Sequence, residues 1–330
     1  NKMNPQSFER KLIVNEEVSY RLDGFLEVRF NDNGLNSKYE YSYDENGNET
    51  LGIEYNWDSE SQSFVPSSKL ESSYDENGNR TLYIQYYWNS ESQSLVPSGK
   101  LEISYDENGN ITLEIEYNWD SESQSFVPSG KYEYSYDENE NRTLYIRYSW
   151  DSESQSFVPS GKLETSYDEN GNQTLYIDYN WDSESQSFVP NGKYESSYDE
   201  NGNITLEIGY SWDSESQSLV PYQKLEYSYD ENENRTLYIQ YNWDSESKSL
   251  VPESKEEFSY DENNFKTNET IYTWNPVLGI YKPIFKMDIS TLSETDTKLV
   301  REGIMYEYDT NLNTWNELEG EEFKSYWYYT

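Results

Sequence analysis

The side chains of this chain that could do chemistry are carboxylates, amides, hydroxyls and aromatic rings, because the sequence contains no cysteine and no histidine. Catalysis would therefore have to use carboxylate pairs, a serine–lysine pair or tyrosine. Every candidate carboxylate recurs at a fixed spacing along the chain, whereas an active site needs one unique concave group of residues. The pattern predicts a protein without enzymatic activity.

An acidic pentapeptide, Asp-Glu-Asn-Gly-Asn, places oxygen ligands at alternate positions, as calcium-binding loops do. Its first two copies supply the candidate ligands Asp44, Asn46, Asn48, Asp75, Asn77 and Asn79. The glycine is displaced relative to such loops and the distal bidentate glutamate is missing. A hairpin turn, in which Asp and Asn bond to their own backbone, is the competing interpretation. We expect no cofactor other than Ca²⁺ held diffusely along rows of acidic loops.

Asn-x-Thr, the acceptor pattern for N-glycosylation in exported proteins, also recurs along the chain. The competing interpretation is a turn asparagine that precedes a strand beginning with threonine. The candidate acceptors are Asn48, Asn79, Asn110, Asn141, Asn172, Asn203, Asn234 and Asn268.

All of these motifs belong to one repeat of 31 residues, which sets the organisation of the chain. Tryptophan recurs at that spacing at Trp57, Trp88, Trp119, Trp150, Trp181, Trp212, Trp243 and Trp274. Tyr-Asp-Glu-Asn recurs with it, starting at Tyr43, Tyr74, Tyr105, Tyr136, Tyr167, Tyr198, Tyr229 and Tyr260. We expect eight near-identical copies over residues 39–274, an N-terminal cap or partial repeat over 1–38, and diverged repeats or a cap over 275–330.

Each copy reads as a β-hairpin, because two runs rich in Tyr, Ile, Thr and Trp flank an Asn-Gly turn. A three-residue loop ending at Gly78 would pair Ser72 with Leu82 and Leu70 with Ile84, which gathers the apolar side chains on one face. A two-residue loop would split them between the faces, so the three-residue loop is preferred.

The preferred turn places its third residue in the left-handed region, where only glycine is free of strain. Gly78 suits that position. Two copies have Glu140 and Glu233 there instead, at an expected cost of roughly 1 kcal/mol each.

The longer loop that follows Trp88 should pair this residue with Leu95, since an even loop keeps the same face. Phenylalanine takes the place of Leu95 in the copies with Phe64, Phe126, Phe157 and Phe188, which predicts cross-strand aromatic pairs. The opposite, solvated face is expected to carry Lys69, Glu71 and Gln85.

The fold class that follows is all-β: a long antiparallel meander of hairpins with atypical ends. About 16 strands exceed what an open twisted sheet holds without curling or stacking. We therefore expect a coiled, solenoid-like sheet or two packed sheets. No apolar run approaches the ~18 residues of a membrane span, so membrane insertion is not expected.

A formal net charge of −40, from 64 acidic and 24 basic residues, argues against nucleic acid as a partner. Phosphate contacts need a basic face. The same charge keeps a long array soluble and self-repelling.

Tyr-Asp-Glu-Asn-Gly-Asn, followed by Thr-Leu-x-Ile-x-Tyr-x-Trp-Asp and later Val-Pro-x-x-Lys-x-Glu-Tyr, resembles repeat arrays of surface and secreted proteins of Bacteroidetes. Such proteins are commonly exported by the type 9 secretion route. The resemblance covers about residues 38–274, implies a secreted or outer-surface location, and carries no catalytic residues. The chain is also weakly similar to YD repeats, although its units are longer and lack Gly-Arg after Tyr-Asp.

Two further predictions concern glycans. Asp-Ser-Glu resembles a permissive O-glycosylation site of Bacteroidetes at Ser59, Ser121, Ser152, Ser183, Ser214 and Ser245. Aromatic rows could also stack on sugars, although most of the tryptophans share the apolar face and are expected to be core. The tyrosines expected to point outward are Tyr83, Tyr87, Tyr145 and Tyr176.

The function predicted from these features is a structural subunit of an extracellular fibre or surface layer. Its expected partner is another copy of itself, because open edge strands invite pairing. The alternative is a monomeric adhesin stalk or glycan-binding module, with polysaccharide as its partner.

Overall fold

The computed structural model describes the backbone of residues 10–14, 17–21, 24–31, 34–295, 298–309 and 313–328, and the side chains of residues 37–289, 304–309 and 313–317. All regular structure in these ranges is β-strand. The chain divides into two compact units, residues 1–162 and 163–330, and the division falls inside β12 (Ser156–Tyr167).

Unit 1 begins with a small two-stranded sheet and continues as an antiparallel meander. The small sheet pairs β1 (Arg10–Val14) with β2 (Glu17–Arg21). In the meander each strand pairs with the next one in sequence, from β3 to β11. The strands are β3 (Gly24–Asn31), β4 (Gly34–Tyr43), β5 (Glu49–Asp58), β6 (Ser63–Tyr74), β7 (Arg80–Asn89), β8 (Ser94–Tyr105), β9 (Ile111–Asp120), β10 (Ser125–Tyr136) and β11 (Arg142–Asp151).

Unit 2 has the same organisation, and each strand from β13 to β22 pairs antiparallel with the next. Its strands are β13 (Gln173–Asp182), β14 (Ser187–Tyr198), β15 (Ile204–Asp213), β16 (Ser218–Tyr229), β17 (Arg235–Asp244), β18 (Ser249–Tyr260), β19 (Lys266–Asn275), β20 (Ile280–Thr295), β21 (Lys298–Asp309) and β22 (Thr314–Tyr328). The predicted all-β meander of hairpins is confirmed.

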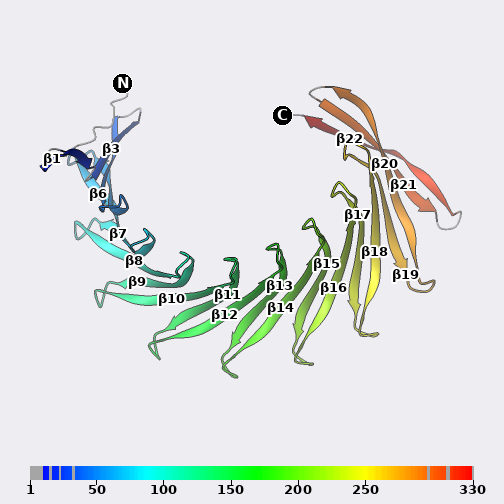
Figure 1. Cartoon of the computed structure of the whole chain (residues 1–330), viewed down its shortest axis with the longest axis horizontal. Helices are drawn as coiled ribbons and strands as arrows, with labels where there is room; N and C mark the ends of the chain where they lie inside the picture. Colours follow the sequence, from blue (N-terminus) through cyan, green and yellow to red (C-terminus); the bar gives the residue numbers. More distant parts are fainter. Residues whose placement is uncertain are drawn as a thin grey trace. The chain divides into compact units, whose positions relative to one another are not determined.

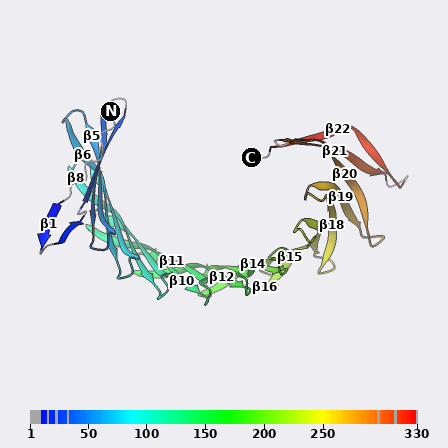
Figure 2. The same cartoon turned by 45° about the horizontal axis from the view of Figure 1, so that its top comes forward.

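The meander is a single layer of strands in each unit (Figures 1 and 2). Only two apolar side chains among the described ones are buried, Ile103 and Phe258, each 8% exposed. Most others are half-buried, and Trp57 is 38% exposed. The expected packing of a second sheet onto the apolar face is therefore not seen within either unit.

The short turn has the three-residue form predicted for it. The backbone N–H of Asp75 donates to the carbonyl of Asn79 at 2.9 Å, and Gly78 has a φ of +85°. The two glutamates at the equivalent position, Glu140 and Glu233, adopt a φ of +65°. The left-handed backbone conformation predicted for this position is confirmed in both copies, and its expected cost remains a prediction.

The strand register beyond the turn differs from the prediction. Tyr74 pairs with Arg80 as expected, but Ser73 then pairs with Leu82, because a β-bulge leaves Thr81 without a partner residue. Leu70 consequently pairs with Gln85 and not with Ile84. One extra residue in a bulge shifts all the following pairs by one and moves their side chains to the other face.

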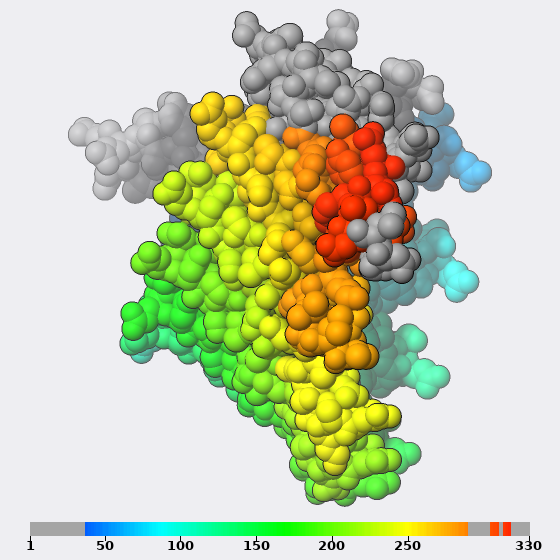
Figure 3. Space-filling view, turned by 90° about the vertical axis from the view of Figure 1, so that its right-hand side faces the viewer, coloured from blue at the N-terminus to red at the C-terminus, as the bar shows by residue number. Residues whose placement is uncertain are grey.

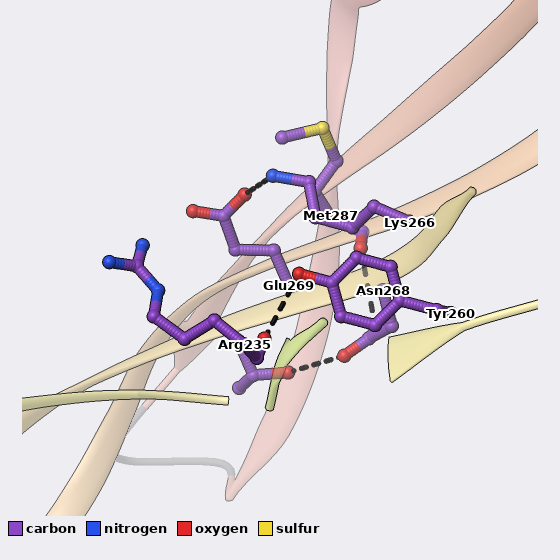
Figure 4. Close-up of polar contacts among 7 residues, drawn as sticks. Arg235, Tyr260, Lys266, Asn268, Glu269 and Met287 are labelled. Carbon is purple, nitrogen blue, oxygen red and sulfur yellow. Dashed lines mark hydrogen bonds and ion pairs between the residues drawn. The ribbon is translucent and has the colours of Figure 1, made fainter. Parts of the chain in front are cut away.

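The bulge is held by side chains, which explains why it recurs. Thr81 Oγ1 donates to the carbonyl of Ser73 at 3.3 Å. Tyr105, from the next copy, donates its hydroxyl to the carbonyl of Arg80 at 2.9 Å. The equivalent bond from Tyr260 to the carbonyl of Arg235 is drawn in Figure 4. The tyrosine of the Tyr-Asp-Glu-Asn motif thus ties each of these copies to the one before it.

The long loop confirms its predicted pairing. Trp88 pairs with Leu95, and Trp57 pairs with Phe64, whose ring lies edge-on at 5.2 Å between centroids. A second bulge follows, because Tyr86 pairs with Pro97 and Gln85 with Gly99. Proline has no N–H to give to a ladder, so a bulge is one of the few places a strand tolerates it.

The two bulges set which side chains share a face. Lys69 pairs with Tyr86 and Glu71 with Ile84, so the lysine and the glutamate lie on the face of Ile84, Tyr86 and Trp88. The prediction that Lys69 and Glu71 lie on the opposite face was wrong, while Gln85 does lie there. We call the first surface the lysine face; it carries the residues equivalent to Lys69, Glu71, Tyr86 and Trp88.

The opposite surface is the tyrosine face. It carries the residues equivalent to Leu70, Ser72, Tyr83, Gln85 and Tyr87. The apolar residues are therefore divided between the two faces, and neither face is a purely apolar one.

Both ends of the meander keep the hairpin form with different residues. At the N-terminal end of the meander, β3 and β4 make a hairpin. Trp274 pairs with Tyr281, in place of Trp–Phe. Tyr308 pairs with Trp315 across β21 and β22, with ring centroids 5.1 Å apart. The domain limits at residues 38 and 274 remain predictions.

Candidate interaction surfaces

The lysine face carries a cluster of three residues that recurs from copy to copy. Tyr86 donates its hydroxyl to Glu71 Oε2 at 2.6 Å, and Lys69 Nζ lies 2.9 Å from Glu71 Oε1. The ammonium also lies 3.6 Å from the centroid of the Tyr86 ring, where it is attracted by the negative ring face. Lysine, tyrosine and glutamate therefore satisfy one another on a half-exposed surface.

The same cluster recurs along both units. The hydroxyl-to-carboxylate bond, at 2.6–2.9 Å, is made by Tyr55, Tyr86, Tyr117, Tyr148, Tyr179, Tyr210, Tyr241 and Tyr272. The lysine–glutamate ion pair joins Lys38–Glu40, Lys69–Glu71, Lys100–Glu102, Lys131–Glu133, Lys193–Glu195, Lys224–Glu226 and Lys255–Glu257. Its repetition indicates a structural task, because each copy needs it.

The contacts within this cluster shift the pKa values of Glu71 and Tyr86. Partial burial raises the pKa of Glu71, but hydrogen bonds from Tyr86 and Lys69 outweigh it and leave the pKa below its usual value. Burial first, and then the bond to Glu71, raise the pKa of Tyr86 to about 12. The tyrosine therefore stays protonated and the glutamate stays charged across the neutral range.

The tyrosine face differs from copy to copy. Tyr132 stacks on Tyr145 with ring centroids 6.0 Å apart, and Tyr134 donates its hydroxyl to Glu114. In another copy Tyr227 makes the same type of bond to Glu207, at 2.7 Å. The outward tyrosines of the sequence analysis lie on this face: Tyr83, Tyr145 and Tyr176 are half-buried and Tyr87 is 48% exposed.

Two tyrosines that sequence reasoning missed are among the most exposed aromatic residues of this face. Tyr194 is 48% and Tyr222 is 40% exposed. Tyr222 donates its hydroxyl to that of Tyr194 at 2.9 Å. The signal was available in the sequence, because most other copies have serine where Tyr222 stands.

The calcium candidates act as turn-forming groups. Asp44 Oδ1 accepts the backbone N–H of Asn46 at 2.9 Å and that of Asn48 at 2.8 Å, while Oδ2 accepts the Asn48 side-chain amide at 3.0 Å. Asp75 makes the same contacts with Asn77 and Asn79. These N–H donors lower the pKa of Asp44 and occupy the oxygens that a metal would use. The contacts favour the turn interpretation of the motif.

The glycosylation candidates fall into two structural groups. The Asn-x-Thr asparagines are half-buried, and their amide nitrogen, the atom that would carry a glycan, donates to a neighbouring group. Asn79 donates to Asp75, and Asn268 to the carbonyl of Met287 at 3.3 Å (Figure 4). The serines of Asp-Ser-Glu lie exposed on the long loops. Both modifications remain predictions.

The described residues show neither of two further kinds of feature, metal-binding clusters and membrane-spanning helices. Within it, no three Asp, Glu, His or Cys side chains are grouped as metal ligands would be. The described residues also include no helix with the length and apolarity to cross a membrane.

No protein-family model matches the sequence. No curated protein matches it either. Several solved structures resemble parts of the fold. A protein of unknown function from Bacteroides fragilis shows 20% identity and a TM-score of 0.31, over 39% of this chain and 91% of its own. A DUF3836 family protein from Bacteroides vulgatus shows 15% identity and a TM-score of 0.25, over 31% of this chain and 97% of its own.

A porin-like protein from Bacteroides uniformis shows 9% identity and a TM-score of 0.25, over 70% of this chain and 92% of its own. The resemblance to type 9-exported repeat arrays remains a prediction from the sequence. The structural neighbours of this β-hairpin array thus include Bacteroidales DUF3836 family proteins and a porin-like protein.

Proposed function

We propose that this chain is a non-enzymatic structural protein of the cell exterior that assembles with other copies into a fibre or a surface layer. The observation that carries the proposal is a single layer of strands with one surface repeated every 31 residues. A repeated surface supports repeated contacts with a second array, as in other repeat proteins with extended binding surfaces.

The burial of the strands supports assembly. A domain normally hides one apolar face of its sheet against another layer. Here the described apolar side chains stay half-exposed, and two of them alone, Ile103 and Phe258, are buried. Covering such a layer with a second copy would gain roughly 25 cal/mol for each Å² of apolar surface removed from water.

The contacts between copies support a mechanical task. Tyr105 and Tyr260 each bond the carbonyl of a residue 25 positions earlier, in the preceding copy. The strand ladder adds backbone hydrogen bonds along the same direction. Because these bonds join successive copies, a pulling force along the array is shared among many contacts and is not concentrated at a single one.

Electrostatics set the conditions for assembly. Acidic loops lie at both ends of the strands, and the net charge of −40 opposes the approach of two copies. In the space-filling view the loops of the green and yellow hairpins of unit 2 project as separate knobs (Figure 3). At 0.15 M salt the Debye length falls to about 8 Å, so we expect assembly to strengthen with ionic strength.

Electron microscopy and light scattering test the proposal. The purified chain is examined from low to high protein concentration, in low salt, in 0.15 M NaCl and with added CaCl₂. Polymers or layers with a constant repeat, favoured by salt, are the expected result. Monodisperse monomers under every condition would overturn the proposed function, and labelling of intact source cells with an antibody tests the location.

A further inference from the structure

On the tyrosine face of unit 2, two positions hold residues that differ from those of the other copies. Tyr222 stands where Ser67, Ser98, Ser129 and Ser160 stand in earlier copies. Gly209 stands where the other copies have Glu, Gln, Arg, Asp or Ile. Both departures lie in adjacent strands, β15 and β16, and they are structurally linked.

The link is steric. A Cβ atom built on Gly209 would lie 2.5 Å from Cζ of Tyr222, so a side chain at this position would displace the tyrosine ring. Without one, Tyr222 lies across β15 and its hydroxyl reaches Tyr194 on β14. The glycine therefore makes room for a tyrosine that crosses the strand, and neither substitution would produce this arrangement alone.

Two cavities flank the aromatic residues that result. One, of about 340 Å³, is lined by Tyr176, Asp178, Asn191, Gly192, Tyr194, Tyr210, Ser211 and Tyr222. The other, of about 250 Å³, is lined by Gln173, Leu175, Tyr176, Tyr194, Ser196, Tyr198, Ile204 and Glu207. Tyr176 and Tyr194 form the wall between them, with ring centroids 6.2 Å apart.

Polar groups complete the larger cavity. Asn191 Nδ2 donates to Asp178 Oδ2 at 3.0 Å, which leaves Asp178 Oδ1 and the amide carbonyl of Asn191 able to accept from a ligand. Asn191 is a third departure, because earlier copies have serine at this position. No lysine or arginine lines either cavity, while Asp178 and Glu207 line one each.

We propose that this surface is a binding site for a neutral polysaccharide, with one sugar ring in each cavity. The apolar C–H face of a sugar ring packs on exposed aromatic rings, and its hydroxyls donate to carboxylate and amide oxygens. A few convergent polar groups in a small pocket are the usual form of such sites. The carboxylates exclude uronates and sulfated chains by charge repulsion. The site does not depend on the proposed assembly.

Affinity electrophoresis and calorimetry of the full chain test this site. The probes are soluble galactomannan, xyloglucan, mixed-linkage β-glucan and xylan, with polygalacturonate as the anionic comparison. We expect retardation by at least one neutral polymer and none by polygalacturonate. Absence of binding to all four neutral polymers, or equal binding to polygalacturonate, would overturn the proposal.

Two substitutions locate the site, because each installs a residue that other copies already hold. Tyr222→Ser and Tyr194→Leu should each weaken binding of the retarding polymer at least tenfold. Tyr87→Ser is the matched control, since Tyr87 is also 48% exposed and lies in unit 1; its binding should equal that of the unmodified chain. Circular dichroism confirms folding, and undiminished binding by both site variants would refute the assignment.

Discussion

The two faces of the sheet are built by the same strands, yet they differ in how far the copies agree. On the lysine face all eight copies have lysine, glutamate, tyrosine and tryptophan at the same four positions. On the tyrosine face the position of Gly209 alone holds six residue types. The first face repeats one set of contacts that every hairpin needs, whereas the second can vary without loss of those contacts.

The largest expected effect comes from removing the clusters of the lysine face together, by raising the pH. The pKa of each cluster tyrosine is raised to about 12 by burial and then by its bond to glutamate. A folded-state pKa above the unfolded value of about 10 means that the stabilisation is complete below pH 10 and is lost as pH rises toward 12 and beyond.

Thermal unfolding followed by circular dichroism from pH 7 to pH 12 checks this expectation. The midpoint should stay level to about pH 9.5 and fall steeply above pH 10, because eight clusters ionise in the same range. Phenolate absorbance should show one late-titrating class of tyrosines. A midpoint that is unchanged at pH 11.5 would mean that the clusters contribute nothing to stability.

A smaller effect on stability is expected from single substitutions in β11, which carries one tyrosine on each face. Tyr148→Phe removes the donor to Glu133, held at 2.6 Å on the lysine face, and should cost about 1 kcal/mol. Tyr145→Phe, on the tyrosine face, keeps the ring that stacks on Tyr132 and should change stability by less than about 0.5 kcal/mol. Urea unfolding and amide hydrogen exchange in β10 and β11 measure both. Equal costs would remove the distinction between the faces.

The repeat and both loops could be predicted from the sequence because their signals are local. A 31-residue period, a glycine in a tight turn and an even loop after tryptophan each follow from neighbouring residues. The pairing of Trp57 with Phe64 followed directly from them.

The assignment of faces could not be predicted in the same way, since it depends on two bulges. The bulge at Thr81 is completed by Tyr105, a residue far along the chain whose hydroxyl satisfies the carbonyl of Arg80. The bulge after Pro97 had a local sign, because proline interrupts a ladder. Two such shifts within one repeat moved Lys69 and Glu71 to the other face. The pair formed by Tyr194 and Tyr222 in unit 2 could be found in the sequence only by comparing one copy with the others, because no pattern within a single copy indicates it.

The smallest expected effect concerns the short turns. Turns with glutamate in place of glycine are expected to be less stable than the others. Glu140 has a φ of +65° at a position where Gly109 of the preceding copy has +88°. Glu140→Gly removes the contact between Cβ and backbone that disfavours this region, and should stabilise the turn by about 0.5–1 kcal/mol. Gly109→Glu is the reciprocal control and should destabilise its own turn by a similar amount.

Hydrogen exchange of the turn amides measures the stability of each of the two turns separately, because repeat arrays open locally. Exchange should slow by up to about fivefold in Glu140→Gly and quicken in Gly109→Glu. If both variants shifted exchange in the same direction, the choice between Glu and Gly at this position would not set the stability of the turn, and the backbone cost assigned to Glu140 would be refuted.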